Sequence, residues 1–120
     1  YFKFGRMLLN GKGPDGQAVI SRKMHEMMLS NRIPKSQLPL RIGLSSLPGY
    51  GWGLGVRIMM DPGKAMGLTG KGEFGWAGAA GTYFWVDPSE GMIGVFMTQY
   101  LGSMLPMADD LRSAAYQMLD

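Results

Sequence analysis

The sequence predicts an α+β fold in which an antiparallel sheet is flanked by helices. Apolar residues recur at helical spacing near both ends of the 120-residue chain. Between residues 73 and 99, extended apolar segments alternate with turn residues, as the strands of a sheet do. Because strands followed by a terminal helix pack as helix on sheet, we expect one domain with helices at its ends and a sheet between them.

Residues 1–30 are predicted to be a helical region. Phe4, Met7 and Leu8 stand at helical spacing, and Gly11 favours an end to this helix because glycine adopts the left-handed conformation readily. After a turn, Ser21 occupies the N-cap position of a second helix over residues 22–30. The methionines of that helix form a stripe that we expect to face the core: Met24, Met27 and Met28.

Residues 31–72 are predicted to be an irregular connection with one strand. Pro34, Pro39 and Pro48 interrupt the first part and restrict the residues before them. The segment GYGWGLGVRIM at residues 49–59 alternates small and large side chains, which predicts a single strand whose glycines permit close packing. The DPGK sequence at residues 61–64 then turns the chain.

Residues 73–99 are predicted to hold three antiparallel strands. The extended segments span residues 73–80, 82–86 and 92–99. Asp87, Pro88 and Gly91 form a short connection between the last two segments, so we expect these two strands to pair as a hairpin.

Residues 105–119 are predicted to form the terminal helix. Pro106 lies near its first turn, and Asp109 and Asp110 lie near its positive end, where carboxylates are favoured. The helix has an apolar side formed by Leu111, Ala114, Ala115 and Met118.

Charge and composition narrow the classes of partner. The net charge is +3, yet residues 1–41 carry eight Lys or Arg against two acidic residues, whereas residues 42–120 carry four bases against seven acids. The bases are scattered among apolar residues, so we expect solvated helix faces and no nucleic-acid site. No apolar run approaches the length of a membrane span. The chain has no cysteine, which leaves both a cytoplasmic and a periplasmic or secreted location open.

Common cofactor and metal motifs do not fit their required settings. Two stretches match G-x-G-x-x-G, at residues 11–16 and 70–75, but neither is preceded by a predicted strand and followed by a helix. His25 is the only histidine, and the acidic residues are dispersed along the chain. We therefore expect no bound cofactor and no metal site.

The order of motifs in the second half points to a known family. WAGAAGT is followed by YFWVDP, a short turn, MIGVFMTQ and a terminal helix. This order resembles the C-terminal part of serine β-lactamase-related hydrolases, especially class C-like esterases and relatives of the penicillin-binding proteins. The first helix, ending MLLNGKG, and the helix that follows also resemble the segment before this region in the family. The resemblance implies that residues 1–120 are a C-terminal fragment of a larger hydrolase domain.

The resemblance also implies a set of site residues. In that family a Lys-Thr-Gly, His-x-Gly or Trp-Gly-Gly box lies on a strand that lines the active site. The matching residues are Trp76, Ala77 and Gly78, and the backbone NH of Ala79 would be one donor of the oxyanion hole. An indole at Trp76 offers no cation for a drug carboxylate, so esters are the expected small-molecule substrates. The small residues around this box would leave room for such a substrate.

The family's nucleophile and proton relay are not encoded in these 120 residues. No serine is followed three residues later by lysine, and no tyrosine is followed two residues later by asparagine. We therefore expect the chain alone to be inactive. Its expected partner is the nucleophile-bearing N-terminal portion of the same hydrolase, which would pair beside the last strand, or else a second copy through self-association.

Other interpretations remain open at this stage. The chain could belong to a β-lactamase or a D-amino-acid peptidase relative, or to a non-catalytic interaction protein. Gly75, Gly78 and Gly81 could serve the packing of the sheet without any substrate. A further alternative is a ligand-binding platform of exposed aromatic rings: Trp52, Trp76, Tyr83 and Trp85.

Overall fold

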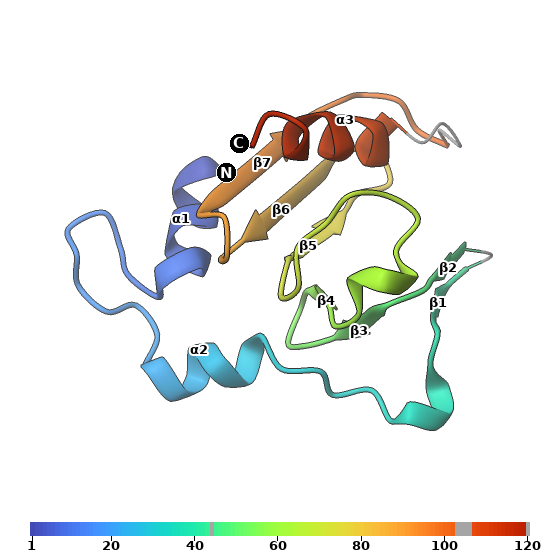
Figure 1. The fold of residues 1–120 in the computed structure, drawn as a ribbon. Helices are drawn as coiled ribbons and strands as arrows, with labels where there is room; N and C mark the ends of the chain where they lie inside the picture. Colours follow the sequence, from blue (N-terminus) through green and yellow to red (C-terminus); the bar gives the residue numbers. More distant parts are fainter. Residues whose placement is uncertain (44, 103–106, 120) are drawn as a thin grey trace.

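The protein has an α+β architecture built around a five-stranded antiparallel sheet (Figure 1). The computed structural model describes residues 1–43, 45–102 and 107–119. The strands of this sheet lie in the order in which they occur along the chain. They are β3 (Tyr50–Trp52), β4 (Arg57–Met59), β5 (Phe74–Ala77), β6 (Tyr83–Asp87) and β7 (Met92–Phe96). The helices are α1 (Phe2–Asn10), α2 (Arg22–Met28) and α3 (Met107–Tyr116), with short 3₁₀ turns η1 (Lys35–Gln37) and η2 (Pro62–Lys64).

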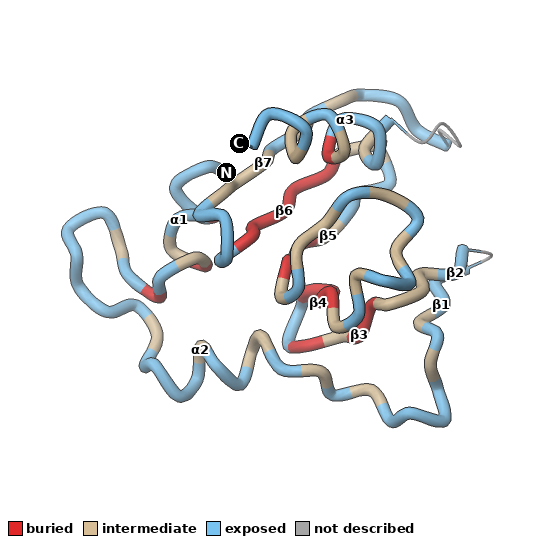
Figure 2. Tube along the Cα trace, in the orientation of Figure 1, coloured by how far each residue is buried: buried red, intermediate tan, exposed pale blue. Residues whose placement is uncertain are grey.

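The predicted hairpin of the last two strands is confirmed. β6 and β7 pair antiparallel, with Tyr83 opposite Phe96 and Asp87 opposite Met92. Asp87 stabilises the connection because its carboxylate accepts a hydrogen bond from the Ser89 backbone NH at 2.8 Å. β5 pairs with the other side of β6, so β6 lies inside the sheet, and all five of its residues are buried (Figure 2).

Helices α1 and α3 cover opposite faces of the sheet. Successive residues of a strand point to opposite faces. Phe84 of β6 contacts the rings of Tyr1 and Phe4 at α1, whereas the neighbouring Tyr83 hydroxyl accepts a hydrogen bond from Arg112 of α3. The apolar core therefore lies between α1 and the sheet, and its buried members are Leu8, Val56, Ile58, Phe74, Phe84 and Val86.

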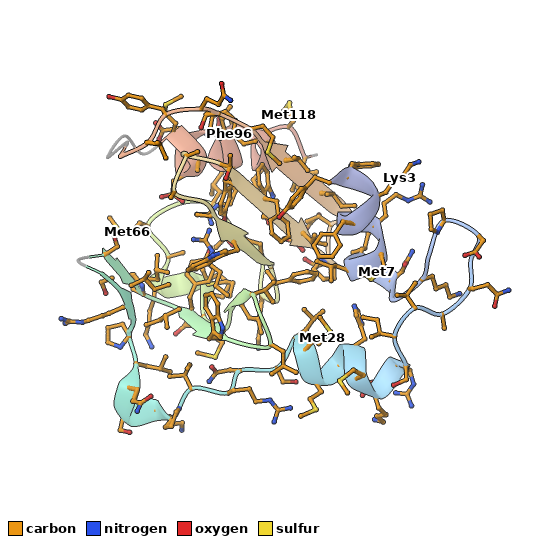
Figure 3. The ribbon with its side chains drawn as sticks, turned by 180° about the vertical axis from the view of Figure 1, so that it is seen from behind. Lys3, Met7, Met28, Met66, Phe96 and Met118 are labelled. Carbon is orange, nitrogen blue, oxygen red and sulfur yellow. The ribbon has the colours of Figure 1, made fainter. Side chains whose placement is uncertain are left out.

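The predicted ends of the first two helices are confirmed by their caps. Gly11 ends α1 in the left-handed conformation, with φ of 73°. The Ser21 hydroxyl accepts a hydrogen bond from the Met24 backbone NH at 3.2 Å and thereby caps α2. The expected core position of the methionine stripe is wrong, because Met24 and Met27 are 45% and 42% exposed. Only Met28, labelled in Figure 3, packs against the core from α2.

The prediction of a single strand within residues 31–72 is also wrong. The structure has four strands there: β3 and β4 of the main sheet, and a separate two-stranded sheet of β1 (Leu40–Ile42) and β2 (Ser45–Leu47). The segment at residues 49–59 reverses in its middle, and Gly55 at the turn has φ of 88°. Alternation of small and large residues suits a strand and a hairpin equally, so the pattern could not reveal the reversal.

Helix α3 lies within the predicted terminal helix, but a charged residue faces the sheet. Pro106 and Leu105 fall outside the described residues, and Asp109 and Asp110 lie in the first turn as expected. Leu111 and Met118 of the predicted apolar side are 43% and 78% exposed, whereas Arg112 is the buried residue of the helix. Within the described ranges no helix has the length and apolarity required to cross a bilayer.

Candidate active-site wall

The Trp76-Ala77-Gly78 segment runs along the end of β5 into the turn that leads to β6. Trp76 lies opposite Phe84, and Ala77 lies opposite Tyr83. The Trp76 indole is half-buried and meets Trp52 of β3 edge-on, with a centroid distance of 4.4 Å. Ala77 and Gly78 are exposed. The sheet therefore fixes the position of the box, while Ala77 and Gly78 at its end remain exposed to solvent.

Two hollows adjoin this segment on either side. One has a volume of about 170 Å³ and is bounded by Tyr1, Trp76 and Met97. The other, of about 340 Å³, is bounded by Phe96, Thr98 and Met107. Ala77 and Gly78 line both hollows. The strand end thus borders two concave surfaces, and a ligand in either could contact Ala77 and Gly78.

The Ala79 amide has no hydrogen-bond acceptor among the described residues. The amide of the preceding residue, Gly78, donates to the Thr82 carbonyl at 2.8 Å, and Gly81 donates to the Gly78 carbonyl at 3.1 Å. These two bonds hold the turn, and Ala79 is exposed at its tip. A backbone NH fixed in this way is chemically suited to stabilise an oxyanion. Ala79 itself does not line either hollow.

The glycines around the box are required by the packing of the sheet. A Cβ on Gly75 would overlap the Phe84 backbone, and a Cβ on Gly78 would overlap the Thr82 hydroxyl. Gly81 has φ of 73°, which side chains rarely adopt. Gly75, Gly78 and Gly81 are thus explained without a substrate, and the exposed residues Ala77 and Ala79 are the ones that a substrate could contact.

The structure does not form the platform of exposed rings that was considered as an alternative. Tyr83 and Trp85 of β6 stack at a centroid distance of 5.6 Å, but both residues are buried. Trp52 and Trp76 contact each other edge-on on another part of the sheet. Flat ligands need accessible ring faces, so these four residues do not offer a shared stacking surface.

A buried polar cluster beneath α3 was not singled out by the sequence. Arg112 Nη1 lies 2.5 Å from the Tyr50 hydroxyl and 3.4 Å from Glu73 Oε2. The Thr69 hydroxyl also donates to Glu73, and Arg57 donates to the Tyr83 hydroxyl. The members of this polar cluster are Tyr50, Arg57, Thr69, Glu73, Tyr83 and Arg112. A single arginine within the apolar segment GVRIM was the available signal in the sequence.

Burial sets the ionisation of this cluster. Burial raises the pKa of Glu73, and the attraction of Arg112 offsets only part of that rise. Burial lowers the pKa of Arg57. Burial also acts to lower the pKa of Arg112, but the nearby Glu73, Tyr50 and Asp109 outweigh it, so the pKa of Arg112 is raised.

The described residues contain no group of three or more His, Asp or Glu side chains arranged to hold a metal ion.

The order of the strands and the helix on each face of the sheet define the class of protein. The fold is that of the C-terminal part of serine β-lactamase-related hydrolases. The chain belongs to the beta-lactamase family, because the family model described as Beta-lactamase matches residues 3–118.

Individual similar proteins agree with this assignment. The chain is 34% identical over 104 residues to Protein Rv1367c of Mycobacterium tuberculosis strain H37Rv and equally to the Uncharacterized protein MT1414 of strain CDC 1551. The matched region covers 83% of this chain and 26% of each relative. The fold is similar to the structure titled "EstCE1, a hydrolase with promiscuous acyltransferase activity", with a TM-score of 0.71 and 21% identity. That match covers 92% of this chain and 27% of the other, so this chain spans about a quarter of the proteins it resembles.

Proposed function

We propose that the chain forms the substrate-lining wall of a serine hydrolase that acts on carboxylic esters through an acyl-enzyme. Trp76, Ala77 and Gly78 would bound the substrate, and the Ala79 amide would donate to the carbonyl oxygen. The observation that carries the proposal is the exposed Ala79 amide, which has no acceptor among the described residues and lies in the turn just after β5.

In acyl transfer, the task of this wall would be to stabilise the negative charge on the carbonyl oxygen. A serine Oγ from another segment would attack the ester carbon and lose its proton to a base on that segment. The carbonyl π electrons would move to oxygen, and the Ala79 amide would stabilise the resulting negative charge. Collapse of the intermediate would break the bond to the alkoxy oxygen, which takes up a proton and leaves as an alcohol. Water would then release the acid by the same sequence.

The side chain at position 76 favours esters over β-lactams. A lysine would offer a full charge to a substrate carboxylate, whereas the Trp76 indole offers an apolar face and one NH donor. The adjoining hollow is bordered by further aromatic and apolar groups from Tyr1, Phe84 and Met97. Neutral, moderately apolar acyl groups therefore fit this wall best.

The missing nucleophile is proposed to come from the N-terminal portion of the same hydrolase. β7 is an edge of the five-stranded sheet, because it pairs only with β6 among the described strands. Val95 on β7 and Met97 just after it are exposed. A strand added to β7 would use its unpaired backbone groups and bury these side chains. Self-association through the same edge is the alternative partner.

Hydrolysis of p-nitrophenyl acetate tests the proposal. We expect no turnover by the chain alone and turnover when a nucleophile-bearing N-terminal segment is added. In that mixture, Ala79→Pro removes the amide proton and should lower kcat by about 10²–10³-fold. Ala79→Gly keeps the amide and is the matched control. Equal kcat values for the two variants would refute the role of this amide.

Size-exclusion chromatography and limited proteolysis test the partner separately. We expect the chain alone to self-associate or to be cleaved near β7, because its edge is unprotected. Addition of the N-terminal segment should give a protease-resistant complex. A protease-resistant monomer of the chain alone, with no change on adding the segment, would contradict the proposed assembly.

A further inference from the structure

Arg57 is a buried cation without a carboxylate partner among the described residues. It lies on β4, is 6% exposed, and its guanidinium is held between the rings of Tyr50 and Tyr83 at 4.5 and 4.7 Å. Nη2 donates to the Tyr83 hydroxyl, while the buried Nε has no acceptor. Buried guanidinium groups are ordinarily paired with an anion, so this arrangement lacks a component.

The nearby carboxylates are already engaged by the second arginine. Arg112 is 3% exposed, and its Nη1 and Nη2 lie 3.4 Å from Glu73 Oε2 and 3.1 Å from Asp109 Oδ1. Its Nε is also buried and without an acceptor in the described part of the chain. Glu73 is therefore the buried carboxylate that influences both cations, although it forms an ion pair with Arg112 and none with Arg57, and the exposed Asp109 pairs with Arg112 alone.

Both arginines line a hollow that opens to the surface. The hollow has a volume of about 280 Å³, and its other polar walls are Ser45 and Ser46 of β2 and Asp109 of α3. Met66, labelled in Figure 3, also lines it and is 92% exposed, so it lies at the mouth. This hollow shares no lining residue with the two hollows beside Trp76 and is a separate site.

We propose that this hollow binds a small oxyanion, either phosphate or a carboxylate, against Arg57, with a hydroxyl of Ser45 or Ser46 on β2 as a further donor. Guanidinium and hydroxyl groups are the usual donors to such anions, and a charge-assisted hydrogen bond is about twice as strong as a neutral one. The volume of about 280 Å³ is many times the roughly 10–15 Å³ that a cavity needs to hold one water, which leaves room for a tetrahedral anion. The lowered pKa of Arg57 is consistent with a cation buried at a cost that an anion would offset.

The carboxylate of Asp109 lines the same hollow and therefore provides a test of where the anion binds. It repels an incoming anion, so its removal should strengthen binding even though one contact to Arg112 is lost. A nonspecific attraction to net positive charge would respond alike to the loss of any exposed acidic residue, whereas an anion in this hollow should respond to Asp109 in particular. The basic hollow beside α1, lined by Lys3, Arg6 and Lys12, is the competing place for an anion to bind.

Isothermal titration calorimetry of the full chain with sodium phosphate and, separately, sodium acetate at constant ionic strength tests the proposal. We expect saturable binding of at least one of the two anions. The anion with the higher affinity shows whether the hollow prefers a phosphate or a carboxylate. Arg57→Gln should weaken it by about tenfold or more, and Asp109→Asn should strengthen it by about threefold to tenfold. Lys12→Gln removes a charge from the competing hollow and should leave binding unchanged.

Three results would overturn the proposal: no saturable binding of either anion, loss of binding in Lys12→Gln, or unchanged affinity in both Arg57→Gln and Asp109→Asn. Circular dichroism establishes that each variant is folded before titration. If Arg57→Gln does not fold, Asp109→Asn decides alone, because its side chain is exposed. A weaker or unchanged affinity in that variant then refutes the site. None of these measurements requires ester hydrolysis, so they do not depend on the proposed activity.

Discussion

The indole of Trp76 meets the ring of Trp52 nearly at right angles, with a centroid distance of 4.4 Å and an interplanar angle of 87°. Trp52 lies on β3 and Trp76 on β5, so the pair spans the intervening strand β4. Edge-to-face aromatic pairs place the positive edge of one ring against the negative face of the other. The contact with Trp52 fixes the orientation of Trp76, which belongs to the proposed substrate wall.

A double-mutant cycle between Trp52→Leu and Trp76→Leu should therefore show coupling. We expect an interaction energy of about 0.5–1.5 kcal/mol in the free energy of unfolding, beyond the loss of buried area. Urea denaturation of the four proteins measures it. Trp52→Leu combined with Val95→Ala, an exposed change on β7, is the control and should be additive. Additivity of the Trp52 and Trp76 changes would show that the ring contact carries no specific energy.

Arg112 and Glu73 should be strongly coupled in stability. Both are buried, and removing one partner leaves the other polar group without its partner in the interior. We expect Arg112→Met and Glu73→Met each to lower the free energy of unfolding by about 3–5 kcal/mol, and the double variant to be more stable than their sum implies. Lys64→Met removes a cation from an exposed ion pair with Asp61 and should cost about 0–1 kcal/mol. Denaturant unfolding gives all these values, and equal costs at positions 112 and 64 would contradict the argument.

The stability of the protein should depend on pH through Glu73. Because burial raises the pKa of Glu73 above its ordinary value of 4.5, the folded state holds this proton at pH values where the unfolded chain has lost it. The stabilising contribution is complete below pH 4.5 and declines as the pH rises through the raised pKa. Relative to wild type, Glu73→Gln should therefore gain stability as the pH is raised above 4.5.

Urea unfolding of both proteins at a series of pH values, with ionic strength held constant, measures this difference. Glu26→Gln is the matched control, because Glu26 is exposed and hydrogen bonds from Lys23 hold its pKa below 4.5. The contribution of Glu26 to the stability of the folded state is therefore present above pH 4.5 and is lost as the pH falls below it. If the free energy of unfolding of the wild type instead increased relative to that of Glu73→Gln as the pH rises, the pKa of Glu73 would be lowered by Arg112 and not raised by burial.

Gly94→Ala should destabilise the sheet because of Trp85. Gly94 on β7 lies opposite Trp85 on β6, and a Cβ at position 94 would overlap the indole ring. The indole is buried and cannot move into solvent. We expect a loss of about 1–3 kcal/mol in the free energy of unfolding, measured by thermal or urea denaturation. Gly94→Ala combined with Trp85→Leu should recover part of the loss, whereas an unchanged loss in that background would exclude the clash as its cause.

The sequence by itself determined the features that depend on neighbouring residues. Gly11 ends the first helix because glycine adopts the left-handed conformation without steric strain. Ser21 begins the second helix because its hydroxyl accepts a hydrogen bond from the Met24 backbone NH, which has no partner within the helix. The turn between β6 and β7 follows from the residues that form it. The order of the box, the hairpin and the final helix was enough to indicate the family that the match over residues 3–118 shows.

Only the tertiary structure decided which residues of these elements meet. Residues 49–59 reverse at Gly55 because β4 pairs with both β3 and β5, a choice that alternation of residue size does not encode. Helix α3 presents Arg112 to the sheet because Glu73, 39 positions earlier in the chain, lies beneath it. Such contacts join segments that are distant in sequence, so their energy depends on the assembled sheet and leaves no local pattern. For the same reason, the sequence pointed to the Trp76 wall but gave no sign of the hollow beside Arg57.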